Sequence, residues 1–374
     1  MVVAAGFLGC APSSRPAFEG SNDGDWPLFR GDTQLSGFAR VTLPEQPVLL
    51  WSYRSDSRVN TSPAVYRQTA YWCDRRGRVY GVDSQGRRCF DYDFATAVEA
   101  SPMICDSVLY IGRIDGFMSA LSLATGDTLW NFETEGQISA SPGAGIFRGK
   151  QAVVFGSYDH FLYCVDRQSG LEIRRFQSGY YINGAVALWK NHFISGGCDA
   201  WLRIIDGTTG APTDSMQLDT YIPASPAIDG DGCYIADHSG NVYELILRDG
   251  TIGRSRKIVE ATGSNGSFVS VPALSETMLC ILSDDRHLYA VDRASGTVRW
   301  KYLQKGNSGE SSPVICNDKV ISCSKSGIVT LLDADSGKWL WEYDTGEQIT
   351  ACPAVIRGRF YILTAKGTLF CFGE

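Results

Sequence analysis

Short apolar segments separated by turn residues run along most of the chain, and their order repeats. One unit begins at Ser101-Pro102 and continues with the apolar segments 103–105 and 108–112. A tight turn at Asp115-Gly116, a third apolar segment, a Thr-Gly turn and a fourth segment that carries an aromatic residue follow. Segments of this length, with turn residues between them, predict four short antiparallel strands in each unit.

The start of each unit is marked by Ser-Pro or by a relic of that dipeptide. The eight markers are Ser62-Pro63, Ser101-Pro102, Ser141-Pro142, Ala185-Val186, Ser225-Pro226, Val271-Pro272, Ser312-Pro313 and Cys352-Pro353. Their mean spacing is about 41 residues, which is the period of a propeller blade when the content is strand-like. A single four-stranded sheet cannot bury both of its faces, so the units are expected to stack as a ring.

The count of units predicts an all-β, eight-bladed β-propeller over residues 47–374. Seven units are complete, from Thr61 to Thr350, and the eighth has only three strands, from Ala351 to Phe372. The segment 48–53 (VLLWSY) precedes the first marker as 128–132 (TLWNF) precedes the third. We therefore expect this N-terminal segment to be the outer strand of the last blade, which closes the ring and hides two sheet edges.

Composition and charge exclude several classes of protein. The 374 residues are 44% hydrophobic and 20% charged, a globular composition, and no apolar run reaches the roughly 18 residues of a membrane span. The net charge of −7 disfavours nucleic-acid binding, which usually needs a basic surplus.

The N-terminus resembles the end of a bacterial lipoprotein signal peptide. The apolar stretch MVVAAGFLG is followed by Cys10 and by a Ser-, Pro- and Gly-rich stretch, 11–25. The resemblance implies that 1–10 is a signal with a lipid-modified Cys10 and that 11–25 is a flexible tether. It places the chain on the periplasmic side of a bacterial envelope membrane, the outer membrane in particular, with the lipid as its only membrane contact.

The segment that joins the third and fourth strands resembles the tryptophan-docking motif of PQQ-type propellers. Residues 120–130, 290–300 and 331–341 carry it, each with a Gly in the turn and a Trp at the end. The resemblance implies a Trp that lies flat between neighbouring blades, and a Gly that permits the turn. The residues expected to have this structural role are Trp51, Trp130, Trp300, Trp341, Gly126, Gly296 and Gly337. Phe90, Arg174 and Asp214 replace the Trp in other blades, where looser packing is expected.

The lead-in segment, residues 26–46, begins WPLFRGD. It resembles the lead-in of bacterial PQQ-binding-like propeller proteins, and we expect it to pack on the outside or the base of the ring.

Two relatives of this design imply different functions. Quinoprotein dehydrogenases bind PQQ and calcium over the central funnel, whereas BamB-type outer-membrane assembly lipoproteins carry no cofactor and dock other proteins. The lipoprotein-like start and the absence of long insertions favour a non-catalytic, monomeric scaffold without a cofactor, whose partner could be an outer-membrane β-barrel. The dehydrogenases typically present adjacent cysteines to PQQ, and no Cys-Cys pair occurs here. A PQQ- and calcium-dependent dehydrogenase and a ligand-sensing propeller remain alternatives.

The other candidate residues have ordinary structural explanations beside the functional ones. The 12 cysteines include no Cys-x-x-Cys and accompany only four histidines, so small buried side chains are a better explanation than a zinc site. Aspartates in the turn between second and third strands could form a ring that binds a cation or a basic partner, but aspartate also suits tight turns. These aspartates are Asp115, Asp159, Asp199 and Asp285.

Aromatic residues gather in the links and turns of the third to fifth units. They belong to the same face of the ring as the aspartates, and aromatic side chains are enriched at interface hot spots. We interpret this sector as a candidate partner-binding face, with routine packing as the alternative. Its members are Tyr158, Asp159, His160, Tyr180, Tyr181, Asp199, Trp201 and Tyr221.

Overall fold

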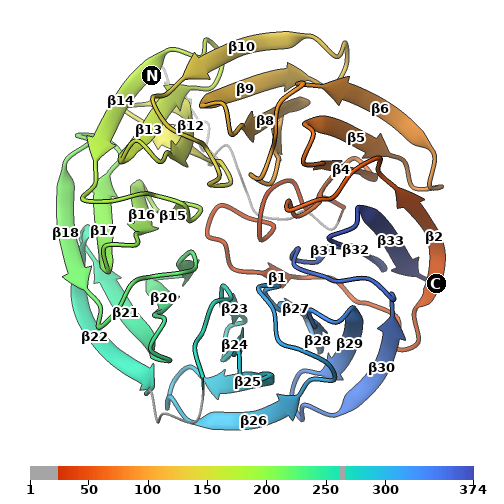
Figure 1. Ribbon diagram of the computed structural model, residues 1–374. Helices are drawn as coiled ribbons and strands as arrows, with labels where there is room; N and C mark the ends of the chain where they lie inside the picture. The colour runs from red at the N-terminus through yellow and green to blue at the C-terminus, as the bar shows by residue number, and fades with distance from the viewer. Residues whose placement is uncertain (1–23, 261–265) are drawn as a thin grey trace, which may run out of the picture.

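A computed structural model of the protein describes residues 24–260 and 266–374. Within these ranges the chain forms strands and no α-helix, and so contains no helix able to cross a membrane. The strands form eight antiparallel four-stranded sheets, arranged as the blades of a ring around a central channel (Figure 1). The predicted eight-bladed β-propeller is confirmed. Cys10 and most of the predicted tether lie outside the described residues, so lipidation of Cys10 stays a prediction.

The two strands of each blade nearest the channel are short and mostly buried. The first strands are β3 (Ala64–Tyr66), β7 (Met103–Cys105), β11 (Gly143–Phe147), β15 (Ala187–Trp189), β19 (Ala227–Asp229), β23 (Ala273–Leu274), β27 (Val314–Cys316) and β31 (Ala354–Ile356). The second strands are β4 (Thr69–Cys73), β8 (Val108–Gly112), β12 (Lys150–Gly156), β16 (His192–Gly196), β20 (Gly232–Ala236), β24 (Met278–Leu282), β28 (Lys319–Cys323) and β32 (Arg359–Leu363).

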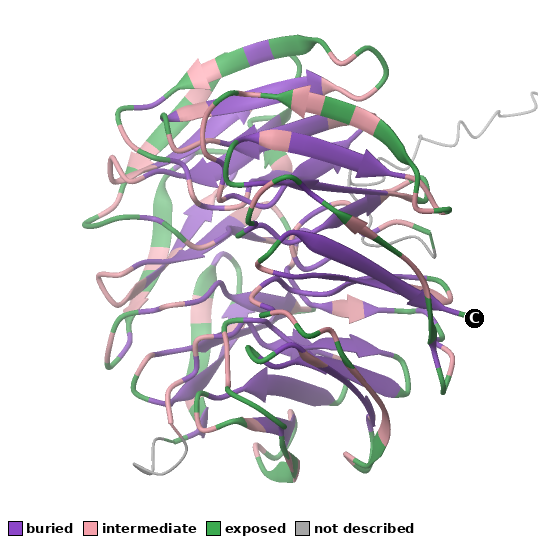
Figure 2. Ribbon diagram, turned by 45° about the vertical axis from the view of Figure 1, so that its right-hand side comes forward, coloured by how far each residue is buried: buried purple, intermediate pink, exposed green. Residues whose placement is uncertain are grey.

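The third strands are also largely buried, whereas the outer strands alternate between exposed and partly buried positions (Figure 2). The third strands are β5 (Arg78–Val82), β9 (Phe117–Ser122), β13 (Phe161–Asp166), β17 (Trp201–Asp206), β21 (Val242–Arg248), β25 (His287–Asp292), β29 (Ile328–Asp333) and β33 (Thr368–Gly373). The outer strands are β6 (Arg88–Asp93), β10 (Thr128–Glu133), β14 (Glu172–Gln177), β18 (Pro212–Gln217), β22 (Thr251–Val259), β26 (Val298–Leu303), β30 (Trp339–Asp344) and β2 (Val48–Arg54).

The ring closes as the sequence predicts. Strand β2, from the start of the propeller, pairs antiparallel with β33, the last strand of the chain, from Val48 opposite Gly373 to Arg54 opposite Thr368. The pairing covers the outer edge of β33, and β2 takes the outer position that every other blade fills from its own unit. Adjacent blades bury their faces against each other, as in the cluster that joins Val79 of blade 1 to Ile104 and Leu121 of blade 2. This stacking supplies the apolar burial that one sheet alone could not.

The lead-in segment corrects an expectation. We expected residues 26–46 on the outside or base of the ring, but residues 26–39 wind through the central channel (Figure 1), and only the end of the segment reaches an outer strand, where Gln46 donates to Leu340 O (3.0 Å). Strand β1 (Phe38–Ala39) pairs parallel with the first strand of blade 7. The first strand of a blade has an unpaired edge on the channel side, and buried backbone groups require hydrogen-bond partners. The lead-in segment provides those partners.

Its backbone carbonyls accept hydrogen bonds from equivalent positions of six blades. Each donor is the N–H of the second residue after the marker proline or its substitute. The pairs are Val65 to Trp26 (2.8 Å), Ile104 to Pro27 (2.7 Å), Leu188 to Thr33 (2.7 Å), Ile228 to Gln34 (2.9 Å), Leu274 to Ser36 (2.9 Å) and Ile315 to Gly37 (3.0 Å). The lead-in segment has no internal repeat, yet it supplies the hydrogen-bond acceptor that the first strand of each of these blades needs.

The side chain of Arg30 binds the lead-in segment to two blades. It is fully buried, and its guanidinium donates to the carbonyl oxygens of Pro313 (2.6 Å) and Pro272 (3.0 Å). Burial lowers its pKa from the ordinary value, because desolvation penalises the charged form. Gly37 lies so close to the guanidinium that a side chain there would collide with it. Arg30 therefore links the adjacent blades 6 and 7 from within the channel.

Candidate functional site

The upper face of the ring, defined by the links between blades and the turns between second and third strands, holds the candidate sites. At the top of the channel the marker serines form hydrogen bonds from blade to blade. The backbone N–H of one marker residue donates to the serine Oγ of the next blade. These pairs are Cys352 to Ser62 (2.9 Å), Ser62 to Ser101 (2.8 Å), Ser101 to Ser141 (3.1 Å), Ala185 to Ser225 (2.8 Å) and Val271 to Ser312 (2.9 Å).

This chain of bonds explains why serine recurs at the marker position. A hydroxyl can accept the N–H of the preceding blade, whereas the side chains of Ala185 and Val271 cannot. Five of the eight junctions, all of which lie within the described residues, carry this bond, and the series is interrupted at the three markers that are not serine, Ala185, Val271 and Cys352. Sequence reasoning used Ser-Pro only as a period marker and missed this role, since the partner lies one blade away.

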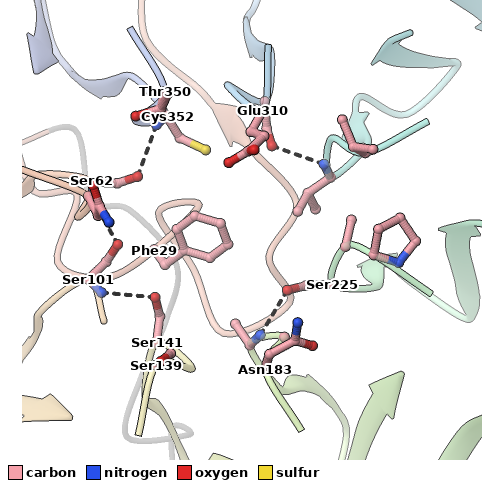
Figure 3. A pocket seen from close by; sticks show the side chains of 18 of the residues that line it. Phe29, Ser62, Ser101, Ser139, Ser141, Asn183, Ser225, Glu310, Thr350 and Cys352 are labelled. Atoms are coloured by element: carbon pink, nitrogen blue, oxygen red, sulfur yellow. Dashed lines mark hydrogen bonds between the residues drawn. The ribbon is translucent and has the colours of Figure 1, made fainter. Parts of the chain in front are cut away.

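Above the serines the channel opens into a funnel of about 410 Å³. Its lower tier is the marker position of all eight blades, and its upper tier is the residue two positions earlier. The upper tier consists of Asn60, Glu99, Ser139, Asn183, Pro223, Val269, Glu310 and Thr350. Phe29 of the lead-in segment lies at the centre of the funnel, where its ring is seen nearly face-on (Figure 3). The lead-in segment thus provides the floor of the funnel.

The charged groups of the funnel do not fit PQQ. Two carboxylates, Glu99 and Glu310, line it, and none of its lining residues is Lys, Arg or His. Glu99 accepts from Asn60 (3.2 Å) and pairs with Arg75, which is half-exposed (3.4 Å). PQQ is a tricarboxylate and would meet Glu99 and Glu310 at the rim, where the nearby Arg75 is already paired with Glu99. Within 24–260 and 266–374, moreover, no cluster of three or more His, Cys, Asp or Glu could hold a metal ion.

The carboxylates of the turn aspartates on the upper face form hydrogen bonds with side chains of their own blades. Asp159 accepts from the Tyr163 hydroxyl (2.7 Å), and Asp285 accepts from the Tyr289 hydroxyl (2.8 Å). Arg113 binds Asp115 through two hydrogen bonds, of 2.9 and 2.8 Å.

The Asp199 carboxylate pairs with the Arg203 guanidinium and accepts from the backbone N–H of Trp201 (3.2 Å). Burial alone would raise the pKa of Asp199, but Arg203 and this N–H hold it below the usual value. These contacts are those of turn-stabilising residues.

The predicted aromatic sector contains one compact group, here called the tyrosine cluster: Tyr158, His160, Tyr180 and Tyr181. Tyr181 is its centre, with ring centroids 5.0 Å from Tyr158, 5.0 Å from His160 and 4.6 Å from Tyr180. Tyr180 and Tyr181 remain 46% and 38% exposed. The cluster joins the turn of blade 3 to the link between blades 3 and 4.

The other aromatic residues of the sector lie apart from the cluster. Tyr221 is 42% exposed and stacks on His238, with centroids 4.5 Å apart. Trp201 is partly exposed beside Asp199. The sequence placed Tyr221 and Trp201 on this face, but His238 was missed because a lone histidine in a turn has no signal of its own.

The docking tryptophans contact the next blade. The Nε1–H of Trp130 donates to the carbonyl oxygen of Arg167 (3.1 Å), and a Cβ on Gly170 would lie 2.6 Å from the Trp130 ring. Trp300 lies equally close to Gly337. A Cβ on Gly126, which the sequence grouped with Trp130, meets nothing within 4 Å. The glycine therefore admits the tryptophan of the preceding blade.

The contact made at the docking position differs among the remaining blades. Trp51 donates to Ser84 O (3.0 Å), whereas Trp341 packs on Phe372 of blade 8 (ring centroids 5.4 Å apart). Beside Gly296 the nearest side chain is that of Ile258, 3.6 Å from a Cβ placed there, and Arg256 makes the hydrogen bond of the missing tryptophan by donating to Arg293 O (2.7 Å).

The eleven described cysteines are unpaired, and most are buried. Burial raises the pKa of Cys233 to about 12 and of Cys371 to about 11. Such thiols are inert at neutral pH, which fits their expected role as small apolar side chains.

Known proteins with similar sequences include members of one family of β-propellers. The family model described as outer membrane protein assembly factor BamB matches residues 40–179 and 199–374, more than half of the chain. The BamB protein of Shewanella oneidensis is 24% identical over 276 residues, which cover 70% of this chain and 67% of that protein.

Solved structures share the fold. The crystal structure of BamB from Moraxella catarrhalis superposes with a TM-score of 0.74 at 21% identity, covering 88% of this chain and 98% of that one. A quinohemoprotein alcohol dehydrogenase from Comamonas testosteroni gives 0.75 at 14% identity, covering 93% of this chain and 80% of that one. At these identities the superpositions show the fold alone, whereas the matched family model covers most of the propeller. The chain therefore belongs to the family described as outer membrane protein assembly factor BamB.

Proposed function

We propose that this protein is a non-catalytic scaffold of a bacterial envelope that binds an outer-membrane β-barrel protein during its assembly. The relatives are named as assembly factors of outer-membrane proteins. The observation that carries the proposal in this chain is the exposed tyrosine cluster on the upper face. Aromatic groups that are rigid and partly exposed bury large area at little entropic cost, which makes them good interface anchors.

The funnel supports a scaffold over the quinoprotein alternative. Its two carboxylates and the absence of basic groups among its lining residues oppose an anionic quinone. The proposal therefore includes neither PQQ nor calcium.

The double variant Tyr181→Ala/Trp201→Ala tests the docking surface. We expect it to reduce co-purification of outer-membrane β-barrels from detergent-solubilised membranes by at least about tenfold, because hot-spot aromatics contribute about 2 kcal/mol or more. Its melting temperature should change little, since both side chains are partly exposed. Trp339→Ala is the matched control, because Trp339 is 55% exposed but lies on the outer strand of blade 7. Equal capture by the double variant and the control would contradict the proposal, and a large stability loss would mark the two residues as core.

We further propose that Cys10 carries the lipid that holds the scaffold at the membrane. Replacing it, as Cys10→Ser, should move the protein from the membrane fraction to the soluble periplasmic fraction and abolish incorporation of labelled palmitate. Retention of both the membrane location and the label in the variant would disprove the anchor.

A further inference from the structure

The funnel has a lining unlike that of a typical apolar ligand pocket. Its side chains are mainly hydroxyls, amides and carboxylates, and its volume of about 410 Å³ lies within the usual range for small-molecule sites. Five marker serines accept a backbone N–H through Oγ: Ser62, Ser101, Ser141, Ser225 and Ser312. A hydroxyl that accepts one bond keeps its own proton and a second lone pair. The lower tier therefore offers several fixed groups that can both donate and accept.

The floor of the funnel is an aromatic face. Phe29 is partly exposed, and Figure 3 shows its ring at the centre of the serine tier. The neighbouring backbone is fixed, because Gly31 N–H donates to Leu28 O (2.9 Å) and Gly37 N–H donates to Arg30 O (3.2 Å). A preformed platform of this kind loses little conformational entropy when a ligand ring stacks on it.

The charges around the funnel do not favour a strongly ionic ligand of either sign. An anion would approach Glu99 and Glu310 at the rim with no basic lining residue to balance them. A cation drawn to the floor would approach Arg30, which follows Phe29 and has its positive charge buried. An anion is thus repelled at the rim although Arg30 lies below the floor, and a cation is attracted at the rim but repelled below it; a neutral molecule meets neither repulsion.

We propose that the funnel binds the neutral, hydroxyl-rich ring of a saccharide. One face of a sugar ring presents C–H groups, which suit the negative face of the Phe29 ring. Its hydroxyls both donate and accept, as do the serines, Asn60 and Asn183, while the carboxylate of Glu310 accepts. The ligand lies on the axis and leaves the tyrosine cluster free, so this site is distinct from the proposed docking surface.

The test uses the full chain and three probes: glucose, N-acetylglucosamine and its β-1,4-linked dimer. Ligand-observed NMR with saturation transfer, at up to about 20 mM sugar, should show transfer to the ring C–H protons of at least one probe, with millimolar affinity. The variant Phe29→Leu keeps an apolar floor but removes the aromatic face, and it should weaken binding about tenfold. Glu310→Gln should weaken it by about threefold or more.

The matched control is Glu135→Gln, because Glu135 is an exposed carboxylate of an upper-face link that does not line the funnel. It should bind the sugar as the unaltered protein does. Glu310 is exposed, so its variant remains informative even if Phe29→Leu folds poorly. The proposal is overturned if no probe binds, if both funnel variants bind as the control does, or if putrescine or PQQ displaces the sugar at lower concentration. None of these results bears on capture of a β-barrel protein, so the two proposals fail separately.

Discussion

Arg30 offers the sharpest test of the channel-filling role of the lead-in segment. In the variant Arg30→Met a flexible apolar chain replaces the buried guanidinium, and the carbonyls of Pro272 and Pro313 lose its hydrogen bonds. A buried acceptor left without a donor costs about 1–3 kcal/mol, so two give about 2–6 kcal/mol. Relief from burying a charge offsets part of this, and we expect a net loss of about 3 kcal/mol.

That loss converts to a measurable change in melting temperature. With an unfolding entropy of about 2.1 cal/mol/K per residue, a ring of this length should melt about 4 °C lower for 3 kcal/mol. The assay is thermal unfolding followed by tryptophan fluorescence, at one fixed scan rate for all variants. Arg40→Met is the matched control on the same segment, because Arg40 is exposed and its pair with Glu276 is 3.8 Å long. It should shift the midpoint by less than about 1 °C. Equal shifts for the two variants would refute the reasoning.

Three further predictions follow from the structure. Gly170→Ala should cost about 2 kcal/mol more than Gly126→Ala in urea unfolding, because both residues have positive φ but only Gly170 lies against Trp130; equal costs would exclude the docking contact. Among the eleven described cysteines, only Cys89 and Cys198 should react quickly with a thiol reagent in the native protein, as mass mapping can show, and rapid labelling of the buried ones would contradict the packing. Titration with PQQ and calcium should give no saturable quenching of tryptophan fluorescence at about 50 µM, and saturable quenching would restore the dehydrogenase alternative.

The repeat made the blades predictable from sequence because each blade is a local unit. Alternating apolar segments and turn residues define a sheet within about 40 residues, and only the closing pair β2–β33 required a long-range argument. That argument succeeded because 48–53 has the pattern of an outer strand without the rest of its blade.

The path of the lead-in segment could not be predicted in the same way. Its partners lie in seven blades, and the bond from Arg30 to Pro313 spans 283 positions. Nothing in the residues 26–46 distinguishes a segment on the outside from one within the channel, since the pairing uses backbone carbonyls that every residue carries. For the same reason, the position of Phe29 at the floor of the funnel could not be predicted.

The sequence predicted which residues lie on the same face of the ring, but not which of them contact each other between neighbouring blades. The sequence placed Tyr158 and Tyr181 on the upper face, but their stacking depends on how the blade 3 turn meets the next link. It also grouped each docking tryptophan with a glycine of its own motif. The contact joins successive blades, as Trp130 and Gly170 show.

The central claim is that the upper face around the tyrosine cluster docks an outer-membrane β-barrel protein. Site-specific photo-crosslinking tests it most directly, with p-benzoylphenylalanine at position 181 of the full chain in living bacteria and at position 339 as the control. The account predicts a crosslink from 181, and none from 339, to a protein that mass spectrometry identifies as an outer-membrane β-barrel. Crosslinks of equal strength from both positions, or from 339 alone, would contradict it.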